Sequence, residues 1–77
     1  MRLRQGILKS DDLNPDGVRI VVNWGSMVTG SSVFILSINV QEALSQIRDV
    51  MNDRGWEYQM QIRVEDEKLG VRVWRLT

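Results

Sequence analysis

The sequence contains no cysteine, no histidine and only one proline in 77 residues, and its ten basic residues are balanced by ten acidic ones. Without cysteine, neither a disulfide nor a thiolate zinc site can stabilise the fold. Without histidine, the commonest general base and transition-metal ligand is missing. A formal net charge of zero argues against strong nucleic-acid binding, which usually accompanies a basic surplus. These absences predict a non-enzymatic protein with no metal and no cofactor.

Long apolar runs are also missing. None approaches the ~20 residues that a membrane-spanning helix requires. The N-terminus MRLRQGILKSDD is basic, but no apolar block of the kind found in secretory signals follows it. We therefore expect an intracellular protein with no membrane partner.

The chain length indicates a single domain. A domain of 77 residues buries a comparatively small share of its surface, so its core is thin. With no disulfide to compensate, self-association is a natural way to add stability. We therefore expect a homo-oligomer.

Two apolar segments in the first half predict β-strands. Residues 18–24, VRIVVNW, are rich in β-branched residues, and every second side chain from Val18 to Trp24 shares one face. Residues 32–38, SVFILSI, form a continuous apolar run between turn formers, which predicts a strand buried on both faces, mid-sheet or in a subunit interface. Residues 1–17 contain the turn-forming cluster SDDLNPDG and are expected to be a loosely ordered arm or an edge strand.

Residues 40–51 carry apolar side chains at helical spacing. Asn39 is a favoured N-cap, and Glu42 completes a pattern similar to a capping box. Gly55 stands where a glycine commonly ends a helix. The sequence therefore predicts an amphipathic helix with the apolar stripe Val40, Ala43, Leu44, Ile47, Val50 and Met51.

The last residues alternate between apolar and polar. In WEYQMQIRVE, the even-numbered residues share an apolar face and the odd-numbered ones a polar face. EDEK forms a turn, and LGVRVWRL returns. Placing Glu65 opposite Lys68 matches the apolar residues of both strands, and a shift by one residue would destroy the match. The expected neighbours are Ile62 and Val71, Met60 and Val73, Gln61 and Arg72, and Gln59 and Trp74.

The predicted order is therefore β-β-α-β-β. Residues 18–77 are expected to form one α+β domain, a small antiparallel sheet with one amphipathic helix packed on one face.

The polar face of the predicted hairpin is the best candidate for a binding site. Arginine offers a planar fork to phosphates, and tryptophan offers a plane for stacking. Sheets that bind single-stranded nucleic acid use surfaces of this kind. An alternative stays open, in which the tryptophan is covered by residues 1–17 or by a second subunit and the arginines pair with glutamates. The candidate residues are Gln59, Gln61, Arg63, Arg72, Trp74 and Arg75.

Two other segments resemble chemical motifs without completing them. Residues 24–32, WGSMVTGSS, are rich in glycine and serine but lack the Gly-Lys-Ser/Thr ending of a P-loop. Their hydroxyls have no histidine to activate them. The acidic stretch DDLNPDG does not reproduce the spacing of an EF-hand. Neither a phosphate loop nor a metal site is predicted.

Residues 24–35, WGSMVTGSSVFI, and residues 70–75, GVRVWR, resemble a loose group of small proteins from tailed phages, many of them marine. The group combines a Gly-x-Ser-x-Phe strand, a helix and a closing Gly-Val-Arg-Val-Trp-Arg strand. The resemblance covers about residues 22–76 and implies a phage origin and a place in the host cytoplasm, but no particular chemistry. The helix here is slightly acidic rather than basic, and Leu36 stands where proline is usual in the group.

Two functional interpretations follow. In the first, the chain is a non-enzymatic nucleic-acid-associated or regulatory module that acts through the outer face of its C-terminal hairpin. In the second, it is a homo-oligomeric protein-interaction module that engages a host or phage protein.

Overall fold

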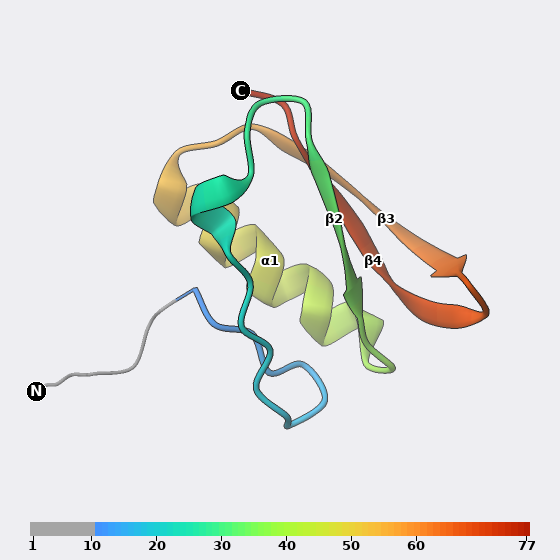
Figure 1. Cartoon of the computed structure of the whole chain (residues 1–77). Coiled ribbons are helices and arrows are strands. Elements are labelled where there is room, and N and C mark those ends of the chain that lie inside the picture. Colours follow the sequence, from blue (N-terminus) through green and yellow to red (C-terminus); the bar gives the residue numbers. More distant parts are fainter. Residues whose placement is uncertain (1–10) are drawn as a thin grey trace, which may run out of the picture.

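The structure is a computed structural model that describes residues 11–77 (Figure 1). The possible edge strand in residues 1–10 lies outside the described residues. Among residues 11–77, no helix has the length and apolar character that a membrane crossing requires. The elements are a 3-10 turn η1 (Trp24–Ser26), strand β2 (Ser32–Leu36), helix α1 (Val40–Arg54), strand β3 (Tyr58–Glu65) and strand β4 (Lys68–Arg75).

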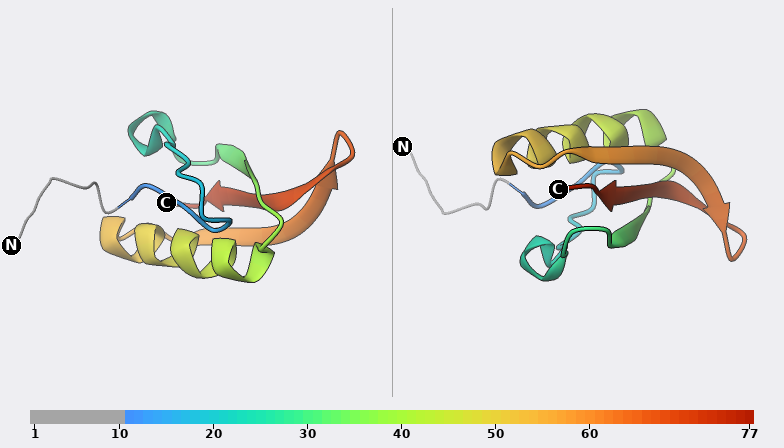
Figure 2. Two further views of the ribbon diagram at one scale, coloured as in Figure 1. Left: turned by 90° about the horizontal axis from the view of Figure 1, so that it is seen from below. Right: turned by 90° about the horizontal axis from the view of Figure 1, so that it is seen from above.

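The three strands form one antiparallel sheet in the order β2-β4-β3, so the last strand lies in the middle. Helix α1 and the segment that precedes β2 both lie on one side of this sheet, and no part of the described ribbon covers the other side (Figures 1 and 2). The α+β class and the single helix on one face are therefore confirmed. The predicted four-stranded order is wrong, because residues 11–77, which include all four predicted strands, form a sheet of three strands.

The hairpin register is confirmed. Glu65 pairs with Lys68, and every pair expected further along the two strands is present. The connecting residues Asp66 and Glu67 both have positive φ angles, of 52° and 63°. Two consecutive left-handed residues are typical of the two-residue turn that suits the twist of a β-hairpin.

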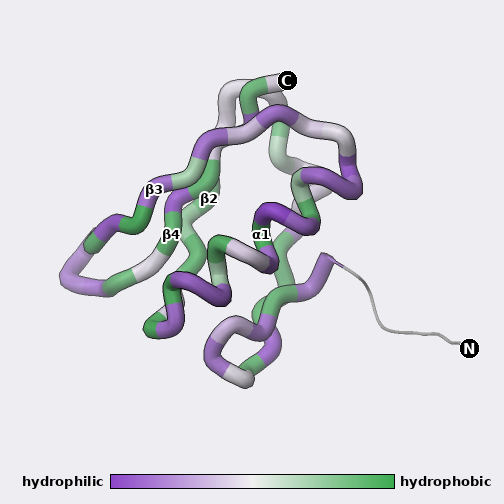
Figure 3. The backbone as a smooth tube through the Cα atoms, turned by 180° about the vertical axis from the view of Figure 1, so that it is seen from behind, coloured by the Kyte–Doolittle hydropathy of each residue, from purple (hydrophilic) through white to green (hydrophobic). Residues whose placement is uncertain are grey.

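The helix is confirmed together with both of its ends. The side chain of Asn39 accepts a hydrogen bond from the backbone N–H of Glu42 (3.2 Å). Gly55 has a left-handed backbone with φ of 70° and ends the helix. Figure 3 shows hydrophobic and hydrophilic residues alternating along α1 as it turns, and Ala43, Ile47, Val50 and Met51 are buried.

The strand predicted over residues 18–24 is wrong. The segment forms only an isolated antiparallel bridge, between Leu13 and Ile20. Its alternation identified the buried side only from Ile20 onward: Trp24 is 1% exposed and Val21 is 72% exposed, but Val18, predicted on the same face as Trp24, is 71% exposed. The indole Nε1 of Trp24 donates to the carbonyl of Asp11 (2.8 Å). The chain then enters η1 rather than continuing beside β2.

The strand predicted over residues 32–38 is shorter than expected, and it is an edge strand. It ends at Leu36, and within the described part of the chain it pairs only with β4. Ile35 is buried, whereas Leu36 is 50% exposed and Ile38 is 83% exposed. The prediction of burial on both faces is therefore wrong, because no part of residues 11–77 covers the sheet face on which Leu36 lies. The predicted mid-sheet position is also wrong, because residues 18–24 form no ladder with β2.

The core lies between α1, the inner face of the sheet and the segment before β2. Leu13 is 1% exposed, so part of the expected N-terminal arm belongs to the core. The buried apolar residues are Leu13, Trp24, Met27, Ile35, Ala43, Ile47, Val50, Met51, Val71 and Val73.

Candidate functional site

The sheet face opposite α1 is the candidate site, and we call it the open face. Side chains alternate along a strand, so the register assigns the even-numbered residues of β2 and β4 and the odd-numbered residues of β3 to this face. The open face therefore comprises Ser32, Phe34, Leu36, Gln59, Gln61, Arg63, Glu65, Lys68, Gly70, Arg72 and Trp74.

Two aromatic rings on neighbouring strands each have a guanidinium group over the ring. The guanidinium carbon of Arg63 is 5.9 Å from the ring centroid of Trp74. That of Arg72 is 5.5 Å from the centroid of Phe34. Both distances are within the range of cation–π attraction. Trp74 and Phe34 are half-buried, so each ring is held by its neighbours and still reaches the surface.

Arg72 ties the three strands together through its guanidinium. Its Nε and Nη2 atoms donate to the carboxylate of Glu65 on β3 (2.7 and 2.6 Å), and its Nη1 atom donates to the hydroxyl of Ser32 on β2 (2.8 Å). These hydrogen bonds from Arg72 hold the pKa of the Glu65 carboxyl below its ordinary value. Arg72 therefore positions the surface and has little hydrogen-bonding capacity left for a ligand.

Arg63 is the more available cation of the open face. Its side chain is 45% exposed and its Nε atom is 3.2 Å from the Glu65 carboxylate. No hydrogen-bond partner for its terminal nitrogens lies within residues 11–77. Gln59 and Gln61 lie exposed on the same strand, opposite Trp74 and Arg72. Five of the six predicted residues are thus brought together.

Arg75 does not join them. It lies opposite Tyr58, on the inner side of the sheet. Its Nη1 atom donates to the carbonyl of Met27 (2.7 Å), and its guanidinium carbon is 3.8 Å from the ring centroid of Trp56. The alternation of the last strand already separates Arg75 from Trp74, and including Arg75 among the candidate residues overlooked this signal.

Phe34 is the aromatic residue of the open face that the sequence did not reveal. The sequence SVFILSI did not indicate on which face of the sheet Phe34 would lie, because a continuous apolar segment shows no alternation. The antiparallel pairing of Phe34 with Arg72 is what brings it to the open face.

The acidic residues of the turn cluster are engaged within the fold. Asp11 pairs with Arg54 (2.8 Å) and Asp12 pairs with Arg19. No group of three or more carboxylates suited to a metal ion occurs in the described part of the chain.

Asp16 joins the turn cluster to the start of α1. Its carboxylate accepts hydrogen bonds from the backbone N–H groups of Asn39 (2.8 Å) and Ile38 (3.0 Å) and from the hydroxyl of Ser37 (3.2 Å). The backbone bonds, that from Asn39 first, lower the pKa of the Asp16 carboxyl. The residue therefore has a structural role.

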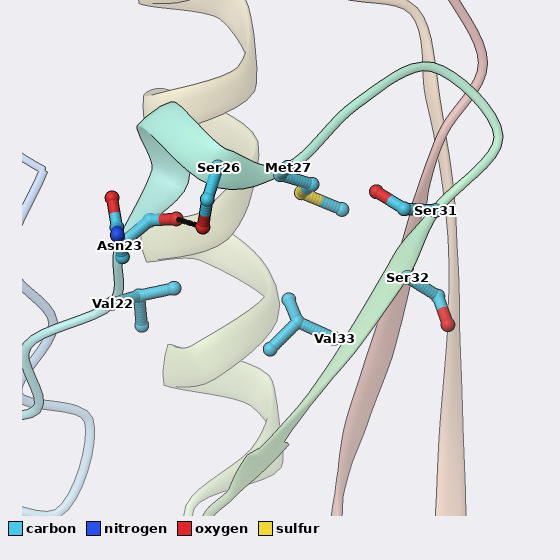
Figure 4. Close-up of a pocket in the computed structure, with 7 residues that line it drawn as sticks. All are labelled: Val22, Asn23, Ser26, Met27, Ser31, Ser32 and Val33. Atoms are coloured by element: carbon cyan, nitrogen blue, oxygen red, sulfur yellow. Dashed lines mark hydrogen bonds between the residues drawn. The ribbon is translucent and has the colours of Figure 1, made fainter.

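The serines of the loop before β2 satisfy local carbonyl groups. Ser26 Oγ donates to the carbonyl of Asn23 (3.0 Å), as Figure 4 shows, and Ser31 Oγ donates to that of Val28 (2.6 Å). Neither hydroxyl faces a base that could activate it.

Comparisons with known proteins add no relative: no protein-family model matches the chain, and neither a curated protein nor a solved structure was found to be similar to it.

Proposed function

We propose that the chain is a non-enzymatic module that binds single-stranded nucleic acid on the open face. The observation that supports this most strongly is the pair of half-buried rings, Trp74 and Phe34, each with a guanidinium group over it, on a sheet face that no part of residues 11–77 covers. Unpaired bases stack on such rings regardless of their sequence.

The charge of the open face favours a modest affinity for nucleic acid that decreases as the salt concentration rises. Three cations, Arg63, Lys68 and Arg72, are offset by Glu65, and Arg72 is largely occupied by that carboxylate. Arg63 is therefore the residue we assign to a phosphate. One or two phosphate contacts give a shallow salt dependence.

A single strand fits this surface better than a duplex. Only a single strand offers unpaired base faces for Trp74 and Phe34. The solvent side of α1 is no alternative for a duplex groove, because it carries Glu42, Asp49 and Asp53 against Arg48 and Arg54.

Fluorescence anisotropy with a labelled thymidine dodecamer and a labelled uridine dodecamer, in low salt, tests the proposal. We expect binding that weakens with salt and that Trp74→Ala reduces about 5- to 150-fold, the range that corresponds to one lost stacking contact. Arg63→Gln is expected to reduce the slope of log affinity against log salt by about 0.7. Arg48→Gln, on the solvent side of α1, is the matched control and should leave binding unchanged. Binding that is insensitive to salt or to Trp74→Ala would refute the proposal.

A protein-interaction module is the second candidate, because Phe34, Leu36 and Trp74 also give the open face an apolar patch. If the patch joins two copies, sedimentation velocity will show a dimer that Trp74→Ala dissociates. If it engages a host protein, the resemblance to tailed-phage proteins suggests the host cytoplasm as the place, and nucleic acid will not compete.

A further inference from the structure

Among residues 11–77, strand β2 has a hydrogen-bonded neighbour on one side only. The N–H of Ser37 donates to the carbonyl of Leu69 (3.1 Å), which shows that odd-numbered residues on this strand bond to β4. The even-numbered residues direct their N–H and C=O groups to the other edge. No backbone hydrogen bond from residues 11–77 reaches that edge. The groups concerned belong to Ser32, Phe34 and Leu36.

A groove runs along this free edge. Residues 20–23 form its opposite wall and make no backbone hydrogen bond to β2. Two cavities of about 320 and 420 Å³ share Val22, Asn23 and Val33 as lining residues, so they form one groove beside the whole strand. Figure 4 shows the side chains of Val22 and Val33 pointing toward one another across it. Volumes of this size are typical of ligand-binding clefts.

None of the described residues that line the groove is charged. At one end it is lined by Ser26, Met27, Ser31 and Ser32, and at the other by Ile20, Val21 and the residues of β2. An uncharged segment loses little hydration on entering such a groove, whereas a charged side chain would lose its hydration without gaining a partner.

We propose that this groove binds an extended, uncharged peptide segment of another protein, which pairs with the free edge of β2 as a fourth strand. Main-chain hydrogen bonds to the three even-numbered residues of β2 supply affinity, and alternate apolar side chains of the peptide pack between Val22 and Val33. The groove shares Ser32, Phe34 and Leu36 with the open face, but the peptide would use their main-chain groups and the side chain of Val33, not Trp74 or Arg63. The inference therefore does not rest on the proposed function.

A single peptide suits the groove better than a second copy of the chain. Antiparallel pairing of two β2 strands about a twofold axis would place both inner faces on the same side. Residues 20–23 of each copy would then compete for the same space. The chain's own residues 1–10 are a poorer match in charge, since they include Arg2, Arg4 and Lys9.

The test is an NMR titration of the full isotope-labelled chain with a blocked heptapeptide of alternating valine and threonine. We expect shifted amide signals at residues 20–23 and 32–36, and slower amide exchange at Phe34. Leu36→Pro removes one edge N–H at a position where an edge strand tolerates proline. Relative to Leu36→Ala, which removes only the side chain, it is expected to weaken binding about two- to twelve-fold, the effect of one hydrogen bond.

A second pair of variants does not alter the strand. Val21 lines the groove and is 72% exposed, while Val18 lies outside it and is 71% exposed. Val21→Glu is expected to abolish binding, and Val18→Glu to leave it unchanged, with both proteins folded.

Four results would overturn the proposal. The first is the absence of any shift at millimolar peptide, and the second is a set of shifts confined to the open face around Trp74. The third is dimerisation that protects the Phe34 amide, which would assign the groove to a second copy. The fourth is nuclear Overhauser contacts between residues 1–10 and Val33 in the free protein, which would assign it to the chain itself.

Discussion

Gly70 leaves room on β4 for two parts of β2. A Cβ atom at this position would overlap the carbonyl oxygen of Ile35 and lie 2.8 Å from Cζ of Phe34. The carbonyl belongs to the backbone of the neighbouring strand and cannot swing aside as a flexible side chain would. Glycine at this position therefore allows Phe34 to cross the sheet toward Arg72 on the open face.

We predict that Gly70→Ala lowers the free energy of unfolding by roughly 1–3 kcal/mol, because the added methyl group forces β2 away from β4. Urea denaturation measures the change. Gly25→Ala is the control, since the nearest atom to its Cβ would be 3.5 Å away, an ordinary contact. Equal losses in the two variants would contradict the close approach at Gly70.

The carboxylate of Glu65 makes stability depend on pH. Hydrogen bonds from Arg72 hold the pKa of this carboxyl below its ordinary value of 4.5. A group of this kind stabilises the fold at pH values above the ordinary value, and the stabilisation is lost as the pH falls through the folded-state pKa. We predict that Glu65→Gln is less stable than the unmodified chain at pH 7, and that the difference shrinks steadily below about pH 4.5.

Urea midpoints for both proteins at several pH values between 7 and about 2 measure this difference. Glu67→Gln is the control, because Glu67 lies in the turn and has no ion-pair partner in the described residues. A difference that persists unchanged in acid would show that the charge of Glu65 is not the cause.

The start of α1 is held from outside the helix as well as by its own cap. Asp16 accepts hydrogen bonds from the backbone N–H groups of Ile38 and Asn39. These donors precede the first helical turn, and negative charge near a helix N-terminus is favourable. We predict that Asp16→Ala accelerates amide exchange at both positions and lowers the melting temperature. Asp53→Ala, exposed near the other end of α1, is expected to do neither.

Whether an element could be predicted from the sequence depends on whether its signals were local. The helix had a cap, a stripe and a terminating glycine within one segment, and the hairpin had two alternating strands around a short turn. Residues 18–24 also alternate, but alternation reports a buried side and not a hydrogen-bonding partner. Trp24 is buried and its indole N–H bonds to the carbonyl of Asp11, so tertiary contacts rather than a strand partner hold this segment in place.

The candidate site was predictable to the same extent. The hairpin register alone was enough to predict that Gln59, Gln61, Arg63 and Arg72 share a face with Trp74. Phe34 and the free edge of β2 did not, because both depend on the pairing of β2 with β4 across more than thirty intervening residues. No period within β2 could have indicated which strand would lie beside it.

At the scale of the whole molecule, three parts of the chain share one small core. Leu13 and Trp24 from the N-terminal segment meet Ile47 from α1 and Val71 and Val73 from β4. A domain of this size has a net stability of roughly 4–12 kcal/mol. The free-energy cost of placing one unpaired charge in this core is therefore comparable with the net stability of the whole domain.

A charge at position 47 should have this effect, because Ile47 is fully buried and the residues clustered around it are apolar. Ile47→Asp removes the packing of a large side chain and places a carboxylate among groups that cannot solvate it, at a combined cost of several kcal/mol. We predict that the variant is unfolded at room temperature, with circular dichroism showing neither helix nor a melting transition. Arg48→Asp, one position along on the exposed side of the helix, should fold and melt cooperatively. If both variants melt alike, α1 does not face the sheet through Ile47.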